Sequence, residues 1–187
     1  MEAQKRLANR RRVYIAYGAM EGPLQANKMK RALIKHGYEV TGSQTDADIV
    51  IAHSGGHLEI NDPSRFKQIL LIDPAFPNNR PIPLNWLLHL LETTRLVFFS
   101  KDWPFFFQTL AINLWYILFD VKRSKSMYSK YSNSSVQKFN LKNVTITSSS
   151  DPTWRDKDLP KLQKVIHFRA SHQDCWLHPS KYLDLLV

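Results

Sequence analysis

Cysteine is almost absent from this sequence, whose 187 residues include only Cys175. A single cysteine excludes an internal disulfide framework and any metal site built from several thiolates, and it is typical of a reducing, cytoplasmic compartment. No internal repeat is present, and a composition of 43% hydrophobic and 22% charged residues shows no sign of global disorder. The length suits one domain over residues 1–187 and is too short for two ordinary ones.

Acidic residues are scarce in two stretches. The chain holds 26 Lys and Arg against 16 Asp and Glu, a net charge of +10. Residues 1–12 carry +4, and residues 121–142 carry +6 because they contain six basic residues and no acid. The excess therefore lies on a basic tail, 1–12, and on one internal segment, while the remainder is neutral. Such patches favour nucleic acid, an anionic membrane surface or simple solvation, and of the two partners we expect the membrane surface and not nucleic acid.

Long uninterrupted apolar runs are also lacking. The basic N-terminus is followed only by the short apolar run 13–20, which predicts no signal peptide. Residues 103–121 approach the length of a membrane span, but the polar residues Gln108, Asn113 and Asp120 interrupt them. We therefore expect no true span and leave membrane contact through this segment open.

Short apolar, β-rich runs predict buried strands at 13–17, 38–40, 48–52, 68–72, 143–147 and 164–168. Helical spacing of apolar residues, ended by Gly37, predicts a helix over 24–36, and 179–186 reads as a closing amphipathic helix. Continuous apolar strands that alternate with helices are typical of an α/β fold. We predict a doubly wound, mostly parallel sheet of about six strands.

Residues 75–142 interrupt this alternation with an aromatic-rich insertion. It predicts helices near 84–93 and 105–120, followed by a mobile basic loop over 124–139. An insertion between the fourth and fifth strands can cover the strand ends without disturbing the sheet, so we expect a helical cap.

The turn Ala52-His53-Ser54-Gly55-Gly56 follows an apolar strand directly. A nucleophilic serine needs a sharp strand-to-helix turn that exposes its Oγ, with small residues two positions before and after, where neighbouring backbone crowds the turn. The turn also presents the N–H of the next residue to a developing oxyanion.

This turn resembles the nucleophile elbow of the α/β-hydrolases, and the chain is most similar to their small single-domain serine hydrolases and esterases. Asp151 follows the fifth strand and His172 the sixth, in the order Ser54, Asp151, His172 that this family uses. The resemblance covers residues 12–74 and 143–187. It departs from the family in two short connections: the one after the second strand leaves no room for a crossover helix, and the helix after the elbow must end early.

The resemblance implies a catalytic triad with Ser54 as nucleophile, His172 as base and Asp151 as the orienting acid. Backbone N–H groups of Gly55 and Ala19 would form the oxyanion hole. The implied reaction is cleavage of a carboxylic ester or related acyl bond of a small molecule through an acyl-enzyme, with no cofactor and no metal.

Several alternatives stay open at the sequence level. Asp73 ends the fourth strand and competes with Asp151 as the acid. His53, His57 and Glu59 match no strong metal-binding motif. A non-catalytic binding module of the same fold, which uses its basic segments on anionic partners or a membrane surface, is the alternative function.

The aromatic residues of the insertion have two readings. Trp103, Phe106, Phe107 and Trp115 are expected to line an acyl-binding site in the cap. Ordinary hydrophobic packing between cap helices is the competing interpretation.

Overall fold

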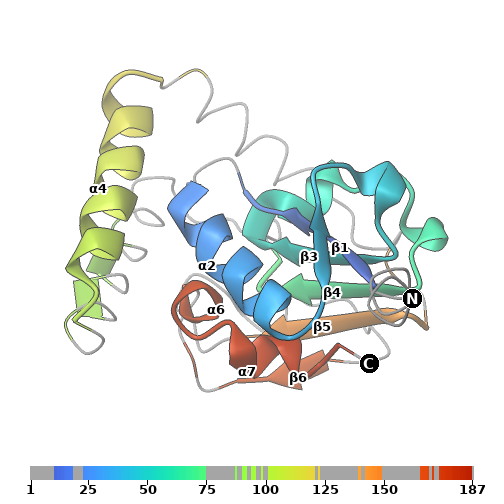
Figure 1. The fold of residues 1–187 in the computed structure, drawn as a ribbon. Helices are drawn as coiled ribbons and strands as arrows, with labels where there is room; N and C mark the ends of the chain where they lie inside the picture. The colour runs from blue at the N-terminus through green and yellow to red at the C-terminus, as the bar shows by residue number, and fades with distance from the viewer. Residues whose placement is uncertain are drawn as a thin grey trace.

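The computed structural model describes residues 11–18, 23–74, 101–120, 142–148, 165–168 and 173–186, with single positions at 87, 90, 91, 94, 95, 98, 122, 139 and 170. Its centre is one six-stranded sheet. The order is β2-β1-β3-β4-β5-β6, and every pair of neighbours is parallel (Figure 1).

The strands are β1 (Arg12–Ala16), β2 (Glu39–Thr41), β3 (Ile49–His53), β4 (Gln68–Ile72), β5 (Val144–Ser148) and β6 (Val165–His167). Each begins and ends within one residue of the run that predicted it, so the parallel α/β sheet is confirmed. Because all six strands run in one direction, the sheet has a carboxyl edge, where every strand ends, and an amino edge, where every strand begins.

The middle of the sheet is buried on both faces. In β3, Ile49 and Ile51 face one hydrophobic core, while Val50 and Ala52 face the other. This is the alternation that a fully covered parallel strand requires.

Helices cover the first face. In α2 (Pro23–Lys35), Met29 and Leu33 are fully buried against the sheet. The predicted closing helix over 179–186 is instead two short helices, α6 (Asp174–Leu177) and α7 (Ser180–Leu183), separated at His178 and Pro179. The break arises because the φ and ψ angles of His178, −126° and 56°, are not helical. Trp176 and Tyr182 from these two helices join the same core.

Short 3₁₀ helices stand where full crossover helices usually lie in this kind of fold, along the other face of the sheet. They are η1 (Gln44–Asp46), η2 (Ser54–Glu59) and η3 (Pro63–Arg65). Ile60 and Phe66, which flank η3, fill the second core beneath them. The fold is therefore trimmed on this side, as the short connections in the sequence predict.

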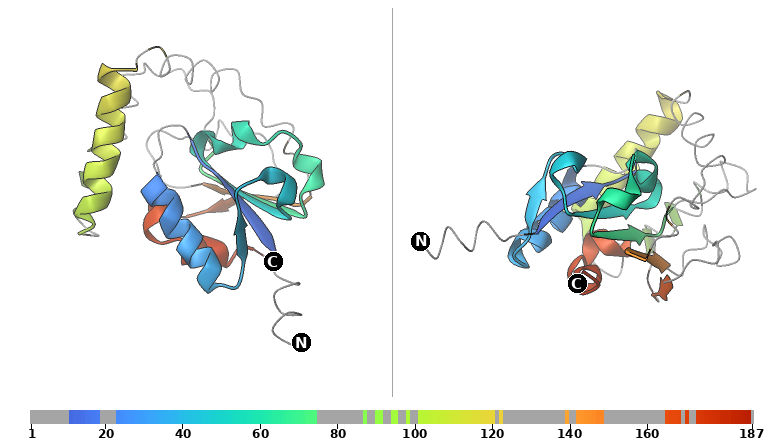
Figure 2. Two further views of the ribbon diagram at one scale, coloured as in Figure 1. Left: turned by 45° about the horizontal axis from the view of Figure 1, so that its top comes forward. Right: turned by 90° about the vertical axis from the view of Figure 1, so that its right-hand side faces the viewer.

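Helix α4 (Trp103–Leu118) lies beside α2 and outside the layer formed by α2, α6 and α7 (Figures 1 and 2). The Asp102 carboxylate caps its first turn by accepting a hydrogen bond from the Phe105 N–H, and it also pairs with Lys28 of α2. Gln25 of α2 donates a buried hydrogen bond to Thr109. Among the described residues, no helix combines the length and the apolar character needed to cross a membrane.

Candidate active site

Ser54 leaves β3 in a left-handed conformation, with φ of +48°. This region costs a side-chain-bearing residue roughly 1–2 kcal/mol, and such strain is concentrated at functional sites. His53 is still extended, and the 3₁₀ helix η2 begins at Ser54 itself, so the chain changes from strand to helix at a single residue. Ser54 remains partly exposed while Gly55 and Gly56 are buried. This is the sharp turn that a nucleophilic serine requires.

Gly56 fits its position only because it has no side chain. A Cβ atom there would lie 2.8 Å from the Tyr17 nitrogen and still closer to the Ala16 carbonyl oxygen. Both are backbone atoms at the end of β1, the strand beside β3. The second small residue of the sequence motif is thus explained by direct contact between two stretches of backbone.

The two histidines of the turn have structural partners. The His57 Nδ1–H donates to the Ser54 carbonyl oxygen at 2.8 Å, a contact that requires the proton on Nδ1 because the carbonyl can only accept. The buried His53 ring packs edge-on against Trp176 of α6, with ring centroids 5.0 Å apart. Neither contact uses the Ser54 hydroxyl. His57 therefore holds the backbone of the turn in place, and both residues of this contact belong to the same 3₁₀ helix.

Asp73 ends β4 in the same way that Ser54 ends β3. Its φ is +44°, its side chain is 1% exposed, and its N–H donates to the Thr147 carbonyl at the end of β5. His53 and Ile72 are register partners, so Ser54 and Asp73 leave neighbouring strands side by side.

Burial raises the pKa of Tyr182 in α7, and the charges of Cys175, Asp174 and Asp73 raise it further. The Tyr182 hydroxyl donates to the Asp174 carboxylate, which also pairs with Lys181 at 3.1 Å. A buried group of acids therefore lies between β4 and the helices α6 and α7. This group could not be predicted from the sequence, because its members are brought together only by tertiary packing.

Asp151, His172 and Ala19 lie outside the described residues. Their neighbours are placed. β5 ends at Ser148, three positions before Asp151, and Gln173, directly after His172, is buried. Four positions after His172, Trp176 contacts His53, the residue before Ser54. The chain that carries His172 thus leads into a helix that packs beside the serine turn.

The aromatic residues assigned to the cap differ in exposure. Trp103, Phe107 and Trp115 are 49%, 61% and 60% exposed. Phe106 packs at the margin of the main core, and the neighbouring Phe105 is buried within it. Phe105 is the aromatic side chain of α4 that is buried in the core, which the uniform run of aromatics does not reveal.

No three His, Cys, Asp or Glu side chains come together in the described part of the chain in a way that could hold a metal ion. The sequence matches no family model and no curated protein.

Solved structures do resemble this one. An α/β-hydrolase enzyme from a Medee basin deep-sea metagenome library aligns over 95% of this chain and 88% of its own, with a TM-score of 0.54 and 11% identity. A thioesterase domain from the curacin biosynthetic pathway aligns over 95% and 90%, with a TM-score of 0.58 and 12% identity. At such identities the likeness shows the fold, which is that of the α/β-hydrolases.

The contact at Gly56 makes a direct prediction about stability. Gly56→Ala forces a methyl group into the β1 backbone, which cannot move without breaking the sheet. We expect a loss of about 3 kcal/mol in the free energy of unfolding, which corresponds to a fall of roughly 6–12 °C in melting temperature for a domain of this size.

Gly42→Ala is the matched control. A Cβ atom at Gly42 meets nothing within 4 Å. Its melting temperature should stay within about 2 °C of the parent, because open surface substitutions change stability by less than about 0.5 kcal/mol. Equal melting temperatures for the two variants, measured by calorimetry, would contradict the close approach of η2 and β1.

Proposed function

We propose that this chain is a serine hydrolase that cleaves a carboxylic ester or related acyl bond. The observation that carries the proposal is the strained turn at Ser54, where a partly exposed serine in the left-handed region follows a buried strand and precedes two buried glycines. The α/β-hydrolase fold raises the expectation of hydrolysis, although a fold alone does not determine chemistry. A structural turn would be served better by glycine at position 54.

In the proposed mechanism Ser54 Oγ attacks the substrate carbonyl while His172 accepts its proton. Asp151 holds the imidazole in the required tautomer and stabilises the imidazolium. The N–H groups of Gly55 and Ala19 donate to the oxyanion, and each donor of this kind is typically worth about 3 kcal/mol. His172 then returns the proton to the leaving group, and water cleaves the acyl-enzyme.

Labelling with a fluorophosphonate, followed by peptide mapping, tests the nucleophile. We expect modification of Ser54 in the parent and none in Ser54→Ala. In Ser54→Ala, hydrolysis of p-nitrophenyl acetate should fall to the background rate, a loss of up to about a millionfold. The substitution leaves the backbone in place, so the melting temperature should change little.

Ser180→Ala is the control, because Ser180 is an exposed serine at the start of α7. It should retain full labelling and turnover. Undiminished turnover in Ser54→Ala would remove the proposed mechanism, whatever the behaviour of the control.

The identity of the acid makes a second test. Asp151→Asn should lower kcat by about 10⁴-fold, the effect expected when the base is held in the wrong tautomer. Asp73→Asn alters a buried group in contact with the core, so it should mainly lower the melting temperature. The opposite ranking in kcat, measured on variants that are folded at the assay temperature, would move the acid to Asp73.

A second candidate function is favoured by the outer side of α4, which we call the α4 apolar face. It consists of Trp103, Phe107, Leu114, Trp115, Leu118 and the capping residue Phe119, all exposed. The spacing from Trp103 to Phe107, Leu114 and Leu118 puts these residues on one side of the helix. Phe105 and Thr109 are buried on the other side, toward α2.

The α4 apolar face fits a membrane surface with anionic lipids. Tryptophan is enriched at the boundary between lipid and water. Exposed Lys101 and Lys122 flank the helix, and a lysine near an anionic surface contributes about 1 kcal/mol. A helix with one face attached to the body and one apolar face outward would lie in the plane of the interface.

Flotation with phosphatidylglycerol vesicles tests this surface. Phe107→Ser with Trp115→Ser should reduce vesicle binding at least tenfold, because both side chains are removed from the lipid boundary. Ile34→Ser, an exposed apolar residue on α2, is the matched control and should bind like the parent.

The same double variant distinguishes lipid binding from acyl-chain binding by the aromatic residues. If they bind lipid, hydrolysis of p-nitrophenyl esters from acetyl to hexanoyl keeps its dependence on chain length. If they bind acyl chains, that dependence flattens while acetyl turnover persists, since each buried methylene contributes about 0.8 kcal/mol. Vesicle binding equal to the parent would contradict the membrane surface.

A further inference from the structure

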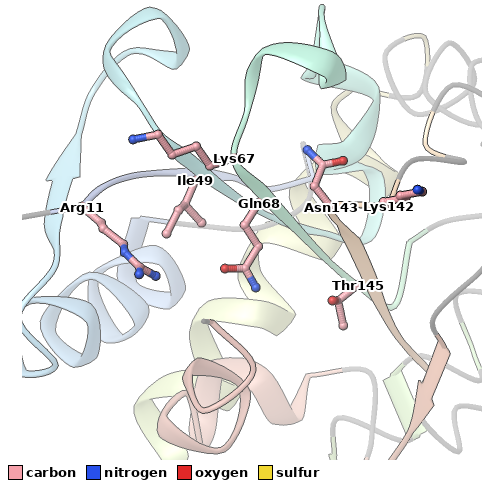
Figure 3. Close-up of a pocket in the computed structure, with 7 residues that line it drawn as sticks. All are labelled: Arg11, Ile49, Lys67, Gln68, Lys142, Asn143 and Thr145. Atoms are coloured by element: carbon pink, nitrogen blue, oxygen red, sulfur yellow. The ribbon is translucent and has the colours of Figure 1, made fainter.

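A cavity of about 460 Å³ lies at the amino edge of the sheet, opposite the edge that carries Ser54 (Figure 3). Its lining comes from the beginnings of four strands. The seven lining residues are Arg11, Ile49, Lys67, Gln68, Lys142, Asn143 and Thr145. Three of the seven are cations and none is an acid. The volume is within the range of small-molecule sites, about 300–1,000 Å³.

The floor of the cavity is one row of residues across three strands. Ile49 of β3 is the register partner of Gln68 of β4. On the other side of β4, the Ile69 N–H donates to the Asn143 carbonyl, which places Asn143 beside Gln68. The Gln68 Nε2 donates to the Leu185 carbonyl at 2.9 Å, and the Asn143 side-chain amide donates to the Phe66 carbonyl. Both amides are therefore held in place.

Charge on this edge is only partly neutralised. Asp48 pairs with Lys67 at 3.0 Å and with Arg12 at 3.7 Å. The hydrogen bond from Lys67, and then that from the Arg12 N–H, lower the pKa of Asp48, so this carboxylate is ionised and already engaged. Among the residues that the structure describes, Arg11 and Lys142 form no ion pair. They stand on opposite sides of the cavity, with Gln68 between them (Figure 3).

The last residues of the two basic stretches of the sequence both lie at this edge. Residues 11 and 12 end the basic tail and lead into β1, while Lys142 ends the basic segment 121–142 and precedes β5. β1 and β5 are separated by β3 and β4, which puts them about 14 Å apart. A chain of charged groups spans this separation better than a single small ion does.

We propose that the amino-edge cavity binds a small polyanion of the oligophosphate class, with Arg11 and Lys142 holding its two ends. A guanidinium presents forked donors that match phosphate oxygens, and lysine supplies a compact point charge. The Asn143 amide and the Thr145 hydroxyl border the path between them. The site is independent of the proposed hydrolase function, because no residue of it belongs to the serine turn.

Calorimetric titration with inorganic tripolyphosphate at fixed ionic strength tests the site. Arg11→Gln with Lys142→Gln should weaken binding at least tenfold. Lys101→Gln with Lys122→Gln removes the same charge from the ends of α4 and should weaken it less than twofold. Binding by the parent should weaken as NaCl is raised from about 50 to 200 mM, since these cations are exposed to screening. Orthophosphate should bind at least tenfold more weakly than tripolyphosphate.

Two results would overturn the proposal. The first is an equal loss of tripolyphosphate affinity in the two double variants, which would mean a diffuse charge effect. The second is the absence of tripolyphosphate binding by the parent. Phosphatidylglycerol vesicles, tested in parallel, show whether the phosphate groups that bind at this edge are those of lipid headgroups. Vesicle binding that depends on Arg11 and Lys142, without tripolyphosphate binding, would also overturn it. Both double variants should hydrolyse p-nitrophenyl acetate at the parent rate. Failure of this site and failure of the hydrolase proposal are therefore distinguishable.

Discussion

The candidate active site depends on one backbone contact, that of Gly56 with the end of β1. β1 and β3 are adjacent and parallel, and the chain that leaves β3 passes the end of β1 so closely that a Cβ atom on Gly56 would clash with the Ala16 carbonyl. The turn is made at Ser54, in a conformation that glycine would adopt without strain. A residue with a side chain is kept there at a cost of roughly 1–2 kcal/mol. That cost is understandable if the side chain is required, and two buried glycines next to it allow the approach that creates the strain.

A left-handed residue at the end of a strand recurs at the carboxyl edge of the sheet. Asp73, one strand further, also leaves its strand in the left-handed region, and its carboxylate is buried rather than exposed. Beneath the turn, Trp176 packs on His53, and Tyr182 and Asp174 bond to each other. Helix α6 is only four residues long, so it is positioned by these contacts and not by its own stability. The chain between β6 and α6 is therefore anchored close to the serine turn at its helical end.

The sheet could be predicted from the sequence because strands covered on both faces are continuous apolar runs. In β3 such a run extends up to His53. The turn at Ser54 was predictable for the same kind of local reason. The helix α6 was not, since its first residue is Asp174, whose buried charge is compensated by Lys181 and Tyr182 seven and eight positions later. The apolar sequence of α4 predicted a helix but not which of its sides is covered. Phe105 and Phe107 are chemically identical, and only tertiary structure buries the first and exposes the second.

A parallel sheet also separates the two kinds of chemistry that this chain carries. Every segment that enters a strand arrives at the amino edge, so Arg11 and Lys142, which end the two basic stretches, lie at the same edge although they are far apart in the sequence. Every segment that leaves a strand begins at the carboxyl edge, where Ser54 and Asp73 lie. A strand of five residues, such as β3, is about 17 Å long, roughly twice the Debye length of about 8 Å at physiological ionic strength. Arg11 and Lys142 are exposed, so counterions in the surrounding solvent reduce the influence of their charge on the distant serine turn. A polyanion bound there would change the electrostatics of an acyl-transfer site only weakly. Any coupling between the two edges would have to pass through the positions of the strands themselves, and the buried, close-packed β3 and β4 resist such movement.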